Sequence, residues 1–265
     1  GLAGIAAPAF ESLTEEQVSA KLGELLNDPT RMIIFHGIFM AITVMIVMRG
    51  IKGGIEAAVT YLMPTFFILL IVLFFYALAT GDRGQGLDFL LGVRLSDTVL
   101  EDGTIRRGLL HGIQDGSVIS AALGQAFFSI GLGSALMATY GAYMREDQDL
   151  PRSSRLIAIA DTGVGIVAGL AIFPIVFAMG LAAGSGPTLM FQTLPLAFHG
   201  MPVGGLFGLA FFVLAFFAAI TSSIALLETS TKWVDEQTKS DRRILSAGGI
   251  GLTAFLIGVA NALSQ

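Results

Sequence analysis

Cysteine is absent from this sequence, and charged side chains are scarce. Of the 265 residues, 13% are charged and 54% are hydrophobic, with no cysteine among them. The lack of cysteine excludes disulfides, cysteine-containing metal sites and thiol catalysis, and it says little about the cellular compartment. A soluble domain usually carries about 25% charged residues. The low charge therefore excludes an ordinary soluble domain and indicates a membrane protein in contact with a lipid bilayer.

The sequence also lacks a basic block and a signal peptide. Its formal net charge is −5, and nucleic acid is not expected as a partner of a chain without clustered basic residues. The chain opens GLAGIAAPAFESLTEEQ, with neither an initiator methionine nor a charged segment ahead of an apolar one. We therefore expect a fragment of a longer protein that begins in the tail of an earlier element. Residues 11–31 are predicted to form a short amphipathic helix outside the bilayer.

Long apolar segments organise the rest of the chain. Six of them are near or above the ~20 residues that a helix needs to span a bilayer. They lie at 32–49, 54–79, 118–143, 155–180, 203–230 and 244–263. This pattern predicts an all-α membrane protein with one transmembrane domain over residues 1–265 and long loops at 81–117 and 181–202. Glycine and proline interrupt the second loop, which is predicted to be a re-entrant or capping hairpin rather than a seventh span.

The basic residues predict the orientation of these spans. Positive charge in short loops marks the cytoplasmic side, whereas long loops cross the membrane largely regardless of charge. Most of the 15 basic residues lie in the three short connections, namely Arg49, Lys52, Arg145, Arg152, Arg155, Lys232, Lys239, Arg242 and Arg243. These connections are predicted to be cytoplasmic, so the long loops are outer loops.

The third apolar segment contains the stretch GQAFFSIGLGSA, residues 124–135, in which Gly131 and Gly133 follow a Phe127-Phe128 pair. In lipid, irregular backbone survives only where it is buried or lines a cavity. A broken transmembrane helix would expose helix ends, which suit carboxylates and cations. The alternative is that both glycines only allow close helix packing.

A carboxylate lies inside the fourth apolar segment, in ADTGVGIVAGLAIFP, residues 160–174. Ionisable groups in a span face the bundle interior and often serve a cation or a proton. Gly165 and Gly169 follow Asp161 on the same helix face and direct it toward another helix. The alternative is an interfacial acid that pairs with Arg155.

Hydroxyl groups are concentrated in the fifth segment, FFAAITSSIALLE, residues 216–228. Ala218, Thr221 and Ser222 are spaced i, i+3 and i+4, so one carbonyl and two hydroxyls share a helix face. This hard-oxygen set suits an alkali cation better than a divalent one, and Leu226 continues the face as a possible apolar pocket wall. The alternative is that the hydroxyls bond back to the carbonyls one turn earlier.

The remaining polar residues in or near the spans are His36, His111, His199 and Glu228. No two of the histidines have metal-ligand spacing, and structural roles are expected for all three. Glu228 lies near the inner end of its span, where an interfacial or helix-pairing role is favoured over a proton relay.

These motifs, in this order, resemble the neurotransmitter:sodium symporter family, most closely its bacterial amino-acid transporters. The resemblance also includes RGIKGGIE after the first span and REDQDL after the third, and it covers nearly the whole chain. It implies a LeuT-fold helical bundle with inverted repeats, of which this chain supplies about the fourth to ninth transmembrane helices. The first three helices and the last ones would be missing partners from the same transporter.

The resemblance assigns roles to individual residues. Two sodium ions are expected in the complete protein, with no organic cofactor. Sodium ligands would be Ser129 and Asp161 at one site, and Ala218, Thr221 and Ser222 at the other. The substrate pocket would be lined by Phe128, Gly131, Gly133, Ser134, Ser222 and Leu226. The gates would be formed by Phe128 as a lid over the substrate, and by Tyr143 and Glu236, with Asp235 beside it, on the cytoplasmic side.

Two positions depart from the chloride-dependent relatives. Those relatives have asparagine where Asp161 stands and serine where Gly165 stands, and there Gln125 and Ser129 help to bind the anion. The resemblance therefore implies that the Asp161 carboxylate replaces chloride. Gly131 stands where other members have serine, which leaves room for a larger substrate side chain, aromatic or branched.

The expected function is sodium-coupled symport of an amino acid or related small amine by alternating access in the cell (inner) membrane, independent of chloride. The expected protein is not an enzyme. One alternative is a non-transporting or channel-like helical bundle. A less favoured one is an intramembrane serine hydrolase with Ser222 or Ser129 as nucleophile and Asp161 as base, because no histidine or lysine lies near either serine within a span.

Overall fold

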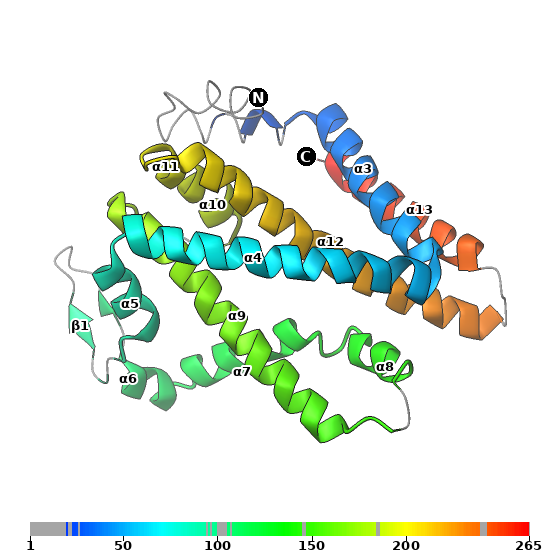
Figure 1. Cartoon of the computed structure of the whole chain (residues 1–265), viewed down its shortest axis with the longest axis horizontal. Helices are drawn as coiled ribbons and strands as arrows, with labels where there is room; N and C mark the ends of the chain where they lie inside the picture. Colours follow the sequence, from blue (N-terminus) through cyan, green and yellow to red (C-terminus); the bar gives the residue numbers. More distant parts are fainter. Residues whose placement is uncertain are drawn as a thin grey trace. The chain divides into compact units, whose positions relative to one another are not determined.

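The computed structural model describes residues 20, 23–25, 27–93, 95, 97–99, 105–106, 108–144, 147–183, 186–238 and 243–264. Most of the predicted helix at 11–31 lies outside them. In chain order, the elements are α3 (Pro29–Met48), the π-helix η1 (Ile51–Glu56), α4 (Ala57–Thr80), α5 (Arg83–Leu91), β1 (Thr98–Val99), β2 (Ile105–Arg106), α6 (Leu109–Gln114), α7 (Ser117–Ile130), α8 (Leu136–Gly141), α9 (Leu150–Ala178), α10 (Gly186–Thr188), the π-helix η2 (Leu189–Thr193), α11 (Leu194–His199), α12 (Gly204–Thr238) and α13 (Arg243–Leu263) (Figure 1).

Five helical segments are long and apolar enough to cross a membrane. They are Pro29–Met48, Ile51–Thr80, Leu150–Ala178, Gly204–Thr238 and Arg243–Leu263. Each overlaps one predicted span, and the sixth predicted span, 118–143, is divided between the shorter helices α7 and α8. The prediction of an all-α membrane fold with about six spans, one of them broken, is confirmed.

The chain forms two compact units, which are described separately. The larger comprises residues 1–83 and 167–265, and the smaller comprises residues 84–166. In the larger unit, α3 packs beside α13, and α12 packs against α3, α4 and α13. A buried apolar cluster joins α3, η1, α12 and α13 through Val47, Ile55, Ile220, Ile224, Leu227 and Ala247. This cluster holds one face of α12.

Local sequence sets both ends of α3. The Asp28 side chain accepts a hydrogen bond from the backbone N–H of Arg31 at 3.1 Å, and Pro29 occupies the first turn, where its missing N–H costs nothing. At the other end Gly50 has φ +78°, a left-handed conformation that stops the helix. The structure then differs from the short connection expected between the spans 32–49 and 54–79, because the π-helix η1 begins at Ile51.

Helix α12 extends further than its predicted span. It continues beyond residue 230 to Thr238, and an exposed pair between Lys232 and Glu236, 3.3 Å apart, stabilises this last part. The segment before it forms the short helices α10 to α11, whose Phe198 is buried against Phe211 of α12. Residues 186–199 of the predicted loop 181–202 are thus helical, with α11 packed onto α12, and a re-entrant or capping hairpin on the outer face stays a prediction.

Candidate functional site

The break between α7 and α8 follows from left-handed residues in the smaller unit. Gly131 has φ +71°, Gly133 has φ +88° and Ala135 has φ +59°. The backbone N–H of Gly131 donates to the Phe128 carbonyl at 3.1 Å, and that of Leu132 donates to the Phe127 carbonyl at 2.9 Å. These two bonds form a Schellman motif, in which glycine takes the position just past the helix end. The glycines therefore end the helix, and the packing alternative does not describe Gly131.

Among the described residues, the cap satisfies only part of the helix end. An α-helix ends with four carbonyls that lack intrahelical donors, and the two bonds of the motif satisfy those of Phe127 and Phe128. The carbonyls of Ser129 and Ile130 lie outside the motif. The helix C-terminus carries a partial negative charge, so this end suits a cation.

Asp161 of α9 lies beside this break. The Ser129 hydroxyl donates to the Asp161 carboxylate at 2.5 Å, so the structure brings together the two residues predicted for one sodium site. The alternative predicted an ion pair between Asp161 and Arg155, and none is present in the described part of the chain. A carboxylate and a hydroxyl next to open carbonyls form an oxygen-rich site. Their role as sodium ligands stays a prediction.

The side chains around the break differ in their surroundings. Phe128 is 84% exposed and is free to cover a ligand. The Ser134 hydroxyl donates to the Gly131 carbonyl at 2.7 Å, which ties the turn to the helix end. A β-carbon at Gly131 would lie 2.6 Å from Cδ1 of Leu136. The predicted pocket residues of this unit therefore lie in one short segment of backbone.

On α12, in the larger unit, three oxygens come together. The Thr221 and Ser222 hydroxyls each lie 3.0 Å from the Ala218 carbonyl and donate to it, and Thr221 is also 2.9 Å from the Phe217 carbonyl. We call the Ala218 carbonyl with the two hydroxyls the α12 oxygen set. Back-bonding to the preceding turn is the alternative named for this motif, and it is present. The same geometry gathers the oxygens that a cation would need.

The oxygen set lies away from the buried cluster. Ile220, Ile224 and Leu227 face the core, whereas Ser222 and Leu226 are exposed one turn apart on the other side of α12. The two residues predicted for the substrate pocket on this helix thus share an accessible face.

The predicted cytoplasmic gate residues fall in separate units. Tyr143 follows α8, with its ring centroid 6.5 Å from that of Tyr140. Glu236 lies on the last turns of α12, paired with Lys232. One carboxylate oxygen of the neighbouring Asp235 is buried and has no hydrogen-bond partner among the described residues.

Glu228 and His36 contact neighbouring helices. Glu228 is completely buried and forms an ion pair with Arg243, whose Nε donates to the Val47 carbonyl at 2.9 Å. This network joins α12, α13 and α3, as the helix-pairing interpretation of Glu228 expected. His36 stacks on Phe255 with ring centroids 5.3 Å apart.

The other two histidines lie outside the long helices. His111 lies 3.1 Å from Asp97, and His199 is in the last turn of α11. The described residues contain no group of histidine and carboxylate side chains able to hold a metal ion.

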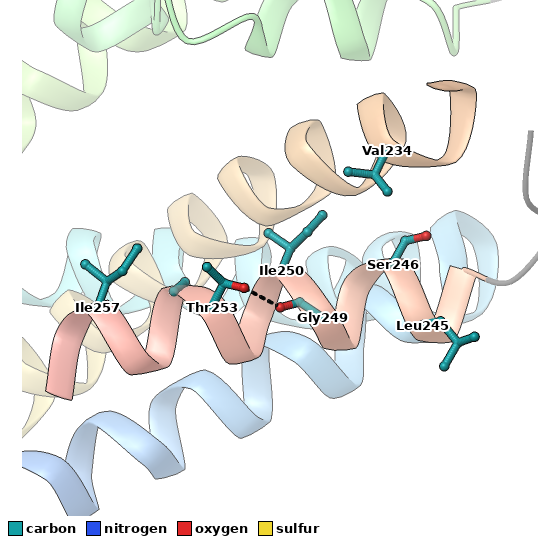
Figure 2. Close-up of a pocket in the computed structure, with 8 residues that line it drawn as sticks. Val234, Leu245, Ser246, Gly249, Ile250, Thr253 and Ile257 are labelled. Atoms are coloured by element: carbon teal, nitrogen blue, oxygen red, sulfur yellow. Dashed lines mark hydrogen bonds between the residues drawn. The ribbon is translucent and has the colours of Figure 1, made fainter. Parts of the chain in front are cut away.

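An apolar groove runs along α13 (Figure 2). Val234 of α12 lines it, together with one face of α13, from which Leu245, Ser246, Gly249, Ile250, Thr253, Ala254 and Ile257 contribute. The Thr253 hydroxyl donates to the Gly249 carbonyl at 2.9 Å, so it is turned to its own helix. The groove contains none of the predicted site residues.

The arrangement defines a class of protein. A bundle of membrane-length helices with one interrupted helix, a carboxylate beside the interruption and a hydroxyl-lined turn is typical of a secondary transporter. The sequence model of the Sodium:neurotransmitter symporter family matches residues 12–264. The chain therefore belongs to this family, which consists of multi-pass membrane transporters and not of enzymes.

Individual relatives agree with this assignment. The chain is similar to the uncharacterized sodium-dependent transporter YhdH of Bacillus subtilis (strain 168), with 34% identity over 259 residues, covering 98% of this chain and 54% of that protein. An uncharacterized sodium-dependent transporter of Haemophilus influenzae is 28% identical over 261 residues, covering 97% and 52%. The chain spans about half the length of the curated relatives it matches.

A solved structure confirms the predicted LeuT-type fold. The chain is similar to MhsT in complex with L-phenylalanine, with a TM-score of 0.79 and 33% sequence identity. The match covers 97% of this chain and 55% of MhsT.

Three features were not predicted from the sequence. They are the π-helix at Ile51–Glu56, the Arg243 partner of Glu228, and a hydroxyl contact between Thr43 of α3 and Ser223 of α12 at 3.3 Å. The last had a signal in the sequence, because Thr43 is a solitary hydroxyl within an apolar span.

Proposed function

We propose that this chain is the central part of a sodium-coupled symporter for an amino acid or related small amine in the cell (inner) membrane. The observation that carries the proposal is the contact between Ser129 and Asp161 beside the broken helix. In lipid a carboxylate next to open backbone needs a positively charged partner. Family membership and the sodium-dependent relatives support sodium as that partner.

Two cation sites are proposed. Ser129 and Asp161 contribute to the first, and the α12 oxygen set contributes to the second. Because the chain spans about half the length of its relatives, the other ligands come from helices encoded outside it. Each sodium ion that crosses contributes about 2.3 kcal/mol per 100 mV of membrane potential, in addition to its concentration gradient.

The substrate is proposed to bind at the broken helix. Gly131 carries no side chain and Phe128 covers the substrate, and the likeness to the family supports Ser222 and Leu226 of α12 as further substrate-binding residues. The phenylalanine bound to MhsT supports an aromatic or branched hydrophobic amino acid. Sodium stabilises an outward-open state, Phe128 closes over the substrate, and the gate at Tyr143 and Glu236 then opens to the cytoplasm.

Transport is further proposed to be independent of chloride, since Asp161 supplies a fixed negative charge. The test replaces Asp161 by asparagine in the natural polypeptide that carries this chain, reconstituted in liposomes with a sodium gradient. We expect uptake of tritiated L-phenylalanine by the unmutated protein to be equal in chloride and gluconate. Uptake by the Asp161→Asn variant should be lost or should depend on chloride.

The matched control is Asp149→Asn at the start of the same helix. The Asp149 carboxylate accepts the backbone N–H of Arg152 at 3.0 Å, and asparagine serves this capping role equally well. Control uptake should therefore remain normal. Unchanged, chloride-independent uptake by Asp161→Asn would contradict the proposed role of the carboxylate, and uptake without any sodium dependence would contradict the symport itself.

A further inference from the structure

A buried chain of hydroxyls connects α3 to α12 directly behind the oxygen set. Thr43 is completely buried, and its hydroxyl lies 3.3 Å from that of Ser223 and 3.0 Å from the carbonyl of Phe39. The Phe39 carbonyl can only accept, so the single proton of the Thr43 hydroxyl goes to it. Ser223 is therefore the donor to Thr43, and the sequence of bonds runs from Ser223 through Thr43 to Phe39.

Three consecutive hydroxyls on α12 are thereby directed to two sides. Those of Thr221 and Ser222 donate to the Ala218 carbonyl of their own helix, whereas Ser223 reaches a neighbouring helix. Successive residues of an α-helix are rotated by about 100°, so Ser223 is rotated by about 200° from Thr221. A contact that holds Ser223 toward α3 sets the direction in which the oxygen set faces.

Apolar packing constrains this rotation less sharply. The flanking residues Ile220 and Ile224 lie in the buried cluster with Val47 of α3, one turn beyond Thr43. Hydrophobic contacts are non-directional, so small rolls of α12 change them little. A hydrogen bond weakens steeply when its angle changes, and the hydroxyl pair therefore selects one rotation.

We propose that Thr43 is a positioning residue for the cation site of α12, through its hydrogen bond with Ser223. This inference rests on the proposed function, because the α12 oxygen set is there a sodium site. Thr43 and Ser223 are not ligands in this proposal. They limit how far the ligand oxygens deviate from the orientation that binds the cation.

The test compares Thr43→Val, which keeps the branched shape, with Thr43→Ser, which keeps the hydroxyl. Each variant is made in the natural polypeptide that carries this chain, purified, and titrated with sodium chloride against choline chloride while its melting temperature is followed. A ligand that binds only the folded state stabilises it by RT ln(1 + [L]/Kd), so fitting the melting temperature against sodium concentration gives the dissociation constant, which equals the half-saturating concentration. The half-saturating sodium concentration is thus measured separately from stability without sodium.

We expect Thr43→Val to raise the half-saturating sodium concentration about threefold, which corresponds to about 0.6 kcal/mol, the average of interhelical hydrogen bonds measured in a membrane protein. The loss is moderate because the freed Ser223 hydroxyl can bond back to its own helix. Ser223→Ala should have the same effect, and the double variant should be no worse than either single one. Thr43→Ser should bind sodium normally.

Thr65→Val is the matched control. Thr65 is exposed on α4 and donates to the Tyr61 carbonyl of its own helix at 2.9 Å, so its loss should leave the sodium titration unchanged. A purely structural role for Thr43 would lower the melting temperature in choline without moving the sodium midpoint, and that result would overturn the proposal. The proposal would also be overturned if the effects of Thr43→Val and Ser223→Ala on the sodium midpoint added up in the double variant, or if neither single variant gave folded protein.

The binding of tritiated L-phenylalanine separates this proposal from the proposed function. If sodium stabilises the unmutated protein but phenylalanine does not bind, the proposed substrate is wrong and the positioning role stands on the titration. If sodium gives no stabilisation at all, the sodium site and the role of Thr43 are both refuted.

Discussion

Replacing Arg243 should destabilise the protein far more than replacing its partner Glu228. The two side chains form an ion pair between α12 and α13, but their surroundings differ. The Glu228 side chain is 0% exposed and the Arg243 side chain is 23% exposed. A guanidinium with access to water is solvated when its partner is lost, whereas a buried carboxylate is not.

The magnitude follows from this asymmetry. Arg243→Met removes the cation from a fully buried carboxylate, and breaking such a pair costs about 3–5 kcal/mol. The variant also removes the donor to the Val47 carbonyl, which adds a loss of about 1 kcal/mol. Glu228→Gln keeps the size and one acceptor oxygen, so its cost should be about 1–2 kcal/mol.

The assay is the apparent melting temperature of the natural polypeptide in one detergent at one scan rate. At about 2–4 °C per kcal/mol, Arg243→Met should lower it by at least about 8 °C. The double variant Glu228→Gln/Arg243→Met should be more stable than Arg243→Met alone, because no buried charge is left uncompensated. Arg31→Ala serves as the control, since its exposed pair with Asp28 at 3.0 Å contributes less than about 1 kcal/mol.

Two results would refute this reasoning. One is a loss for Glu228→Gln that equals or exceeds that for Arg243→Met. The other is additivity, in which the glutamine lowers the stability of Arg243→Met by as much as it lowers that of the unmutated protein.

Three glycine substitutions test the local geometry in the same assay. A β-carbon at Gly54 would overlap the Ile46 carbonyl oxygen, whereas one at Gly53 meets nothing within 4 Å. Gly54→Ala should therefore cost about 2 kcal/mol or more of stability, and Gly53→Ala should be neutral or stabilising. Equal effects of the two variants would contradict the close contact of η1 with α3. Gly131→Ala should cost about 1–2 kcal/mol because alanine is strained at φ +71° and approaches Leu136, and normal stability would argue against the left-handed helix end.

The sequence alone located the spans and the break because both depend on local composition. A run of about twenty apolar residues is long enough to span a bilayer; five of the six predicted runs overlap the membrane-length helices, and the sixth is divided between α7 and α8. The end of α7 at Gly131 was predictable for the same reason, since glycine just past an apolar helix is a local signal for a left-handed cap. The π-helix η1 was not predicted, because IKGGIE carries no periodicity that separates a wide turn from a loop.

Tertiary structure decided how α12 is held. Thr43 and Ser223 lie 180 residues apart in the chain, and Arg243 and the Val47 carbonyl lie 196 apart. The sequence placed Glu228 near the inner end of its span and Thr43 as a solitary hydroxyl within another span, without naming a partner for either. Which polar groups meet depends on the rotation and register of packed helices, and those follow from the combined packing of all the surfaces rather than from any one segment.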